Sequence, residues 1–136
     1  MRKRLHVAAV LIAAAILIVL VCIFAVKRPF LHLNADDIAS AELFLIPPDV
    51  TIPLTDPLKI SKLADILREI RIYKEDDSGR YYDGQLVQAT IILTTGETHT
   101  IGAYGSFLFL DGICYRTEYA PSQALNAFGN GCRNGE

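Results

Sequence analysis

A run of 20 residues without a charged side chain, residues 7–26, constrains this chain more than any other feature. At 1.5 Å per residue a helix of that length is about 30 Å long, which matches the hydrocarbon core of a bilayer. The run is apolar on every face, unlike the single apolar stripe of a helix that packs on a soluble core. Basic residues flank it on both sides: Arg2, Lys3, Arg4, Lys27 and Arg28. The sequence therefore predicts one transmembrane helix over residues 7–26.

Two other kinds of segment, a cleaved signal peptide and a lipid-modified N-terminus, share some of these features. A cleaved signal peptide has an apolar stretch of about 7–15 residues that ends in a small-x-small site. This run is longer and ends Ala25-Val26-Lys27, without such a site. A lipid-modified cysteine normally follows a small residue, whereas Cys22 follows Val21 and four more apolar residues come after it. We therefore interpret Cys22 as a residue that packs within a membrane helix.

The distribution of basic residues predicts the orientation of this helix. The N-terminal side holds more of them, which favours a short cytoplasmic tail over residues 1–6 and a signal-anchor topology. The chain is then a single-pass protein of the cell membrane. Residues 27–35 are interpreted as a tether and residues 36–136 as an extracytoplasmic domain.

Length and charge exclude several classes of protein. The chain has 136 residues, which leaves room for one domain and excludes a large two-domain enzyme. No second apolar run is long enough to span a bilayer, which excludes a multi-span transporter. Residues 29–136 hold eight basic and 15 acidic residues, a net charge of −7. Such a domain is not expected to bind nucleic acid, because that binding depends on cations that neutralise phosphates.

The pattern after residue 35 predicts a mostly antiparallel sheet and two helices. Thr55-Asp56-Pro57 opens an amphipathic helix, since Thr or Asp caps free N–H groups and proline suits the first turn. Pro121–Phe128 predicts a second, short helix with Gly129 just past its end. Residues 71–84 are interpreted as a loop, with a strand at Ile72 as the alternative. The expected strands cover residues 36–46, 51–54, 86–94, 98–104, 107–110 and 113–119. The fold class is therefore α+β.

Asp111-Gly112 is the clearest local signal in the domain. Asp-Gly between two apolar runs is a preferred two-residue hairpin turn, because both central residues need a positive φ. Pairing across this turn divides the side chains between two faces. Leu108, Leu110, Ile113 and Tyr115 are expected on one face, and Phe107, Phe109, Cys114 and Arg116 on the other.

The cysteines offer one structural prediction. Cys114 and Cys132 form an even pair in the domain, and an oxidising exterior favours a disulfide between them. The alternative is two free thiols, with Cys114 half-buried in the sheet.

No established catalytic, cofactor or metal motif occurs in the sequence. A nucleophile formed by Cys114 and His99 is conceivable on neighbouring strands, although nothing supplies an orienting partner. The acidic loop lacks the alternating order of a calcium loop. It also carries tyrosines, which are common at protein interfaces, so we treat it as a candidate partner-binding loop. Its residues are Asp76, Asp77, Tyr81, Tyr82 and Asp83.

Three segments together suggest a resemblance to a known group of proteins. They are Leu54-Thr55-Asp56, the run Ile91-Ile92-Leu93-Thr94-Thr95-Gly96-Glu97, and Phe109-Leu110-Asp111-Gly112-Ile113-Cys114-Tyr115. Over residues 36–128 the chain resembles small, largely uncharacterised extracytoplasmic domains of Gram-positive bacteria, which are tethered by one helix or a lipid. The resemblance implies a compact α+β domain at the cell envelope and provides no catalytic residues.

We therefore expect a membrane-anchored binding or protein-interaction module with a protein partner at the cell envelope and no cofactor. Two alternatives stay open. One is an envelope thiol or redox enzyme that uses Cys114. The other is an accessory subunit of a membrane complex, whose Ala13-Ala14-Ala15 patch permits close helix contact.

Overall fold

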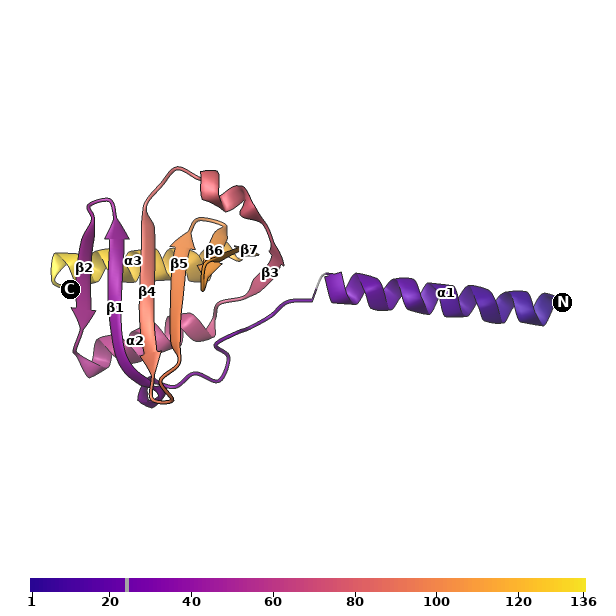
Figure 1. Cartoon of the computed structure of the whole chain (residues 1–136), viewed down its shortest axis with the longest axis horizontal. Coiled ribbons are helices and arrows are strands. Elements are labelled where there is room, and N and C mark those ends of the chain that lie inside the picture. The colour runs from indigo at the N-terminus through magenta and orange to yellow at the C-terminus, as the bar shows by residue number, and fades with distance from the viewer. Residues whose placement is uncertain (24) are drawn as a thin grey trace.

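The computed structural model describes residues 1–23 and 25–136 of the chain. An N-terminal helix, α1 (Arg2–Ile23), precedes an α+β domain with a single antiparallel sheet (Figure 1). The predicted fold class is therefore confirmed. Helix α1 starts before the expected span and ends before Val26, while Phe24 of that span lies outside the described residues.

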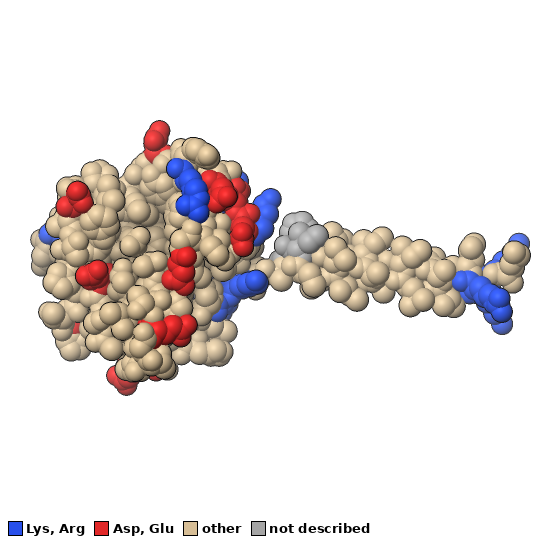
Figure 2. All heavy atoms as spheres, in the orientation of Figure 1, with Lys and Arg blue, Asp and Glu red and all other residues tan. Residues whose placement is uncertain are grey.

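Helix α1 is long and apolar enough to cross a membrane, and none of that stretch is buried against the rest of the protein. A signal sequence near the N-terminus meets the same criteria of length and composition. Figure 2 shows the helix without charged side chains between its basic tip and its junction with the domain. This separation of apolar and charged surface is what a bilayer requires of a spanning helix.

Seven strands form the sheet in the order β2-β1-β4-β5-β6-β7-β3, and every neighbouring pair is antiparallel. Their bounds are β1 (Ile38–Ile46), β2 (Val50–Leu54), β3 (Ile72–Glu75), β4 (Leu86–Leu93), β5 (Thr98–Tyr104), β6 (Phe107–Leu110) and β7 (Ile113–Thr117). The strand considered at Ile72 thus exists as β3, at one edge of the sheet. Short 3-10 helices precede β1 and β4, namely η1 (Ala35–Asp37) and η2 (Asp77–Tyr81).

Helices α2 (Pro57–Arg68) and α3 (Tyr119–Asn134) both cover one face of the sheet (Figure 1). Asp56 caps α2 as predicted, because its carboxylate accepts a hydrogen bond from the Leu58 N–H at 2.9 Å. The core lies between this helical layer and the sheet. Its fully buried side chains include Leu43, Leu45, Leu63, Leu67, Val87, Ile91, Ile101, Leu108 and Leu125.

Helix α3 is longer than the predicted closing helix. It continues through Gly129 to Asn134 and ends at Gly135, which has a φ of 83°. Gly129 does not end the helix because it lies inside the contact with the sheet. A Cβ atom built on Gly129 would come within 2.6 Å of Val87 Cγ1, so the missing side chain lets α3 approach β4 closely.

Residues 27–35, expected as a tether, instead pack on the domain, and we call them the strap. Lys27 exchanges two backbone hydrogen bonds with Ile72 of β3, each 2.9 Å long. Phe30 and Leu33 are buried in the core. The domain therefore begins at Lys27 rather than at residue 36.

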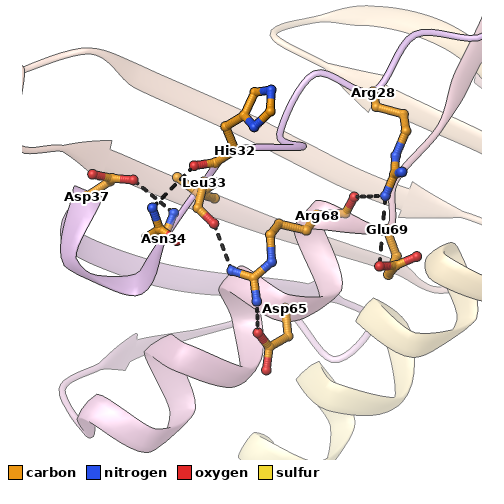
Figure 3. Close-up of polar contacts among 8 residues, drawn as sticks. All are labelled: Arg28, His32, Leu33, Asn34, Asp37, Asp65, Arg68 and Glu69. Atoms are coloured by element: carbon orange, nitrogen blue, oxygen red, sulfur yellow. Dashed lines mark hydrogen bonds and ion pairs between the residues drawn. The ribbon is translucent and has the colours of Figure 1, made fainter.

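Polar contacts fasten the strap to α2 (Figure 3). The Arg28 guanidinium donates a hydrogen bond to the carbonyl of Arg68 at 2.9 Å and lies 3.8 Å from the Glu69 carboxylate. Arg68 in turn donates to the carbonyl of Leu33 at 2.8 Å. These bonds satisfy carbonyls of the strap and of the end of α2.

Candidate binding site on the open face of the sheet

The face of the sheet opposite α2 and α3 carries no α-helix in the described part of the chain (Figure 1). The side chains of β4 alternate between the two faces of the sheet, and Val87, Ala89 and Ile91 are buried on the side that the helices cover. Leu86, Gln88, Thr90 and Ile92 alternate with them and point to the other side. We call this second side the open face.

The open face is more apolar than a solvated sheet face normally is. Phe44 and Ile46 of β1 lie there, and Ile46 is 43% exposed. Leu86 and Ile92 of β4 and Phe109 of β6 add to the same surface. Figure 2 views this face and shows that its acidic side chains are scattered rather than gathered into one patch. A partly exposed apolar surface of this kind is typical of a binding site.

Gly102 lets two side chains close over the middle of this face. It lies in β5, paired with Gln88 on one side and Phe109 on the other. A Cβ atom on Gly102 would be 3.1 Å from Leu86 Cδ1 and 3.4 Å from Phe109 Cβ. Its φ is in the ordinary range, so the backbone does not require glycine. Gly102 is itself buried, so the missing side chain makes room for Leu86 and Phe109 to pack over the strand.

A pocket of about 390 Å³ lies on this face, and we call it the open-face groove. Its walls combine apolar and aromatic side chains with a few polar ones. The lining residues are Ile46, Pro47, Arg80, Gly84, Leu86, Gln88, Thr100, Tyr104, Phe109 and Gly112. Apolar walls with a few polar groups are the usual chemistry of a binding pocket.

Aromatic rings and a guanidinium border the groove. The rings of Tyr82 and Tyr104 meet edge to face with centroids 4.9 Å apart, and Tyr104 lies 6.2 Å from the ring of Phe109. The Arg80 guanidinium lies 5.5 Å from the centroid of Phe109 and donates to the carbonyl of Gly112 at 2.8 Å. Tyr and Arg in this arrangement are the residue types that dominate binding energy at protein interfaces.

The predicted partner-binding loop divides into structural and exposed residues. Asp76 accepts a hydrogen bond from the Ser78 N–H at 3.0 Å and lies 2.8 Å from Nε of Arg116. The hydrogen bonds from Ser78 hold the pKa of Asp76 well below its usual range, and the Arg116 guanidinium lowers it further. Asp76 therefore stabilises the loop as a cap of η2.

The other four residues are more exposed. Asp77 pairs with Arg80 at 3.0 Å, which fixes the arginine beside the groove. Tyr81 is 87% exposed, whereas Tyr82 packs against Tyr104. Asp83 is also exposed. None of the five predicted residues lines the groove, although the same loop contributes Arg80 and Gly84 to its wall. Sequence reasoning missed the residues of the sheet that line the groove, for which the outward-facing Leu86 was the available signal.

The predicted disulfide is absent, and Cys114 and Cys132 are free. Cys114 pairs with Phe109 in the sheet and lies on the open-face side, where Gly79 of η2 covers it. Cys132 lies on α3, on the helical side. The sheet separates the two sulfur atoms, so the prediction of a bridge was wrong. Burial raises the pKa of both thiols, because a buried thiolate would lose its hydration.

His99 does not lie beside Cys114, because its ring packs against Phe30 of the strap with centroids 5.7 Å apart. Both ring nitrogens face carboxylates. Nδ1 is 2.9 Å from Asp111 and Nε2 is 3.3 Å from Glu97. These residues line a second pocket of about 450 Å³ between the strap and the ends of β4, β5 and β6. The described residues bring no nucleophile to His99.

The described residues contain no cluster of three or more His, Cys, Asp or Glu side chains that could hold a metal ion. No known protein family, curated protein or solved structure matches this chain. The conclusions about function therefore depend on the geometry described above.

Proposed function

We propose that this protein is a membrane-anchored binding module of the cell envelope that uses the open-face groove to bind a segment of a protein partner. Helix α1 is the anchor, with the short N-terminal tail in the cytoplasm and the domain outside. The open-face groove carries the proposal, because apolar and aromatic walls with a few polar groups are the usual chemistry of a binding pocket. The composition of the groove supports a protein partner, since Tyr, Phe and Arg are enriched at interfaces.

Site-specific photo-crosslinking in intact membranes tests this proposal. A photoreactive phenylalanine analogue replaces Ile46, which is exposed and lines the groove. The same analogue at Gln123, an exposed position of α3, is the control. We expect a discrete crosslinked product from position 46 and none from position 123. Equal crosslinking from both positions, or none from either, would contradict a binding site on the open face.

A pair of lysine substitutions on β4 separates binding from folding. Gln88→Lys places a long charged side chain in the groove, which Gln88 lines. We expect the product from position 46 to disappear in this variant. Thr90→Lys, half-buried on the same face of β4 but outside the groove, is the matched control and should leave the product unchanged.

The orientation is tested separately by adding protease to intact cells. We expect the domain to be degraded while the cytoplasmic tail survives. A domain that stays intact, although the same protease cuts it after lysis, would refute the proposed topology.

A further inference from the structure

The strap brings the domain close to the end of helix α1. Only residues 24–26 separate Ile23, the last residue of α1, from Lys27, which already pairs with β3. Four residue steps span at most about 14 Å. The apolar run continues to Val26, so Lys27 is the first charged residue after it. If α1 spans a bilayer, the connection between the membrane and the domain is only these three residues long.

The strap cannot leave the domain without disrupting the core. Phe30 and Leu33 are each 7% exposed. The hydrogen bonds between Arg28 and Arg68, and between Arg68 and Leu33, hold the backbone on both sides of Phe30 (Figure 3). The strap therefore stays on the domain, and the chain enters the domain at the β3 edge of the sheet.

The exposed side chains of the strap suit an anionic lipid surface. The strap contains Lys27, Arg28 and His32 and no acidic residue, although the domain as a whole is acidic. Figure 2 shows basic side chains, with acidic ones beside some of them, on the side of the domain next to α1. Leu31 of the strap is 39% exposed and lines the pocket next to the strap. Basic and apolar side chains together are typical of protein surfaces that lie in the headgroup region.

We infer that the exposed side of the strap, formed by Lys27, Pro29, Leu31 and His32, is a lipid-binding surface that rests on the anionic headgroups of the bilayer. The inference depends on the membrane anchor proposed above. It fixes the orientation of the domain, because β2 then lies farthest from the membrane-proximal edge. Six strand spacings separate β3 from β2, a distance of about 29 Å.

Depth-dependent fluorescence quenching tests this inference on the full chain in vesicles. Cys22 and Cys132 are replaced by alanine, while Cys114 is retained because it is fully buried and should not react with a maleimide probe in the folded protein. An environment-sensitive fluorophore is then attached to Leu31→Cys, with Thr51→Cys on β2 as the matched control. Spin-labelled lipids that carry the quencher near the headgroup should reduce the emission at position 31 about twofold and leave position 51 almost unchanged.

Lipid composition and flotation complete the test. Replacing anionic lipids with phosphatidylcholine should reduce the quenching at position 31, and Lys27→Gln should have the same effect in anionic vesicles. Equal and weak quenching at positions 31 and 51 in protein that floats with the vesicles would overturn the lipid-binding surface alone. Protein that does not float would overturn the anchor and the inference together.

Discussion

Substitution of Gly129 by alanine tests how closely helix α3 packs on the sheet. Alanine stabilises a helix interior by about 1 kcal/mol relative to glycine. The new Cβ atom, however, would be 2.6 Å from Val87 Cγ1, about 1 Å closer than an ordinary carbon contact. Relieving such a contact in a packed core costs about 1–3 kcal/mol. We expect Gly129→Ala to lower the free energy of unfolding by about 1 kcal/mol.

Gly131→Ala is the matched control on the same helix. Its Cβ atom would meet nothing closer than the flexible Glu136 carboxylate at 3.5 Å. The gain in helix propensity should therefore remain, and we expect stabilisation by about 0.5 kcal/mol because this position is near the helix end. The two variants should differ by roughly 1.5 kcal/mol, which corresponds to about 1 M in the urea midpoint for a domain of this size.

Tyrosine fluorescence of the full chain in detergent measures both values. All six tyrosines lie after residue 72, so the signal reports the domain and not α1. Val87→Ala removes the opposing methyl group and should restore part of the stability lost in Gly129→Ala, a coupling that a double-mutant cycle measures. If Gly129→Ala stabilises the domain as much as Gly131→Ala does, the close approach of α3 to β4 is refuted.

Two other regions give direct predictions. In the folded protein Cys132 should react with a maleimide and Cys114 only after unfolding, and peptide mapping should find both thiols free after exposure to air. A Cys114–Cys132 disulfide in the mapped peptides would contradict their placement on opposite sides of the sheet. The pKa of Asp76 is lower in the folded than in the unfolded protein, so its ionised form stabilises the fold above about pH 4. This contribution is lost as the pH falls toward the pKa of the folded protein. The urea midpoint of Asp76→Asn should lie below that of the wild type at pH 7 and approach it below about pH 4, whereas a constant difference at all pH values would rule out ionisation as the cause.

The sequence indicated the elements whose signals are local. The length of the apolar run predicts α1, and Asp56-Pro57 predicts the start of α2. Asp111-Gly112 predicts the last hairpin and the alternation of its side chains, which the observed register confirms. These predictions succeed because hydrophobic period, helix caps and turn conformations depend on residues close together in the chain.

The functional surfaces depend on contacts between distant segments. Nothing near Gly102 in the sequence indicates that Leu86 and Phe109 will border it, and the same holds for the pairing of Lys27 with Ile72. Cys114 and Cys132 are only 18 positions apart, yet the sheet lies between them.

The sequence by itself therefore determined the long apolar N-terminal helix, the α+β class and the alternation within each strand. Only the tertiary structure decided which strands are neighbours, which face the helices cover, and where the open-face groove and the strap lie. The physical reason is that local backbone preferences select each element, whereas burial of apolar side chains from distant elements selects their arrangement.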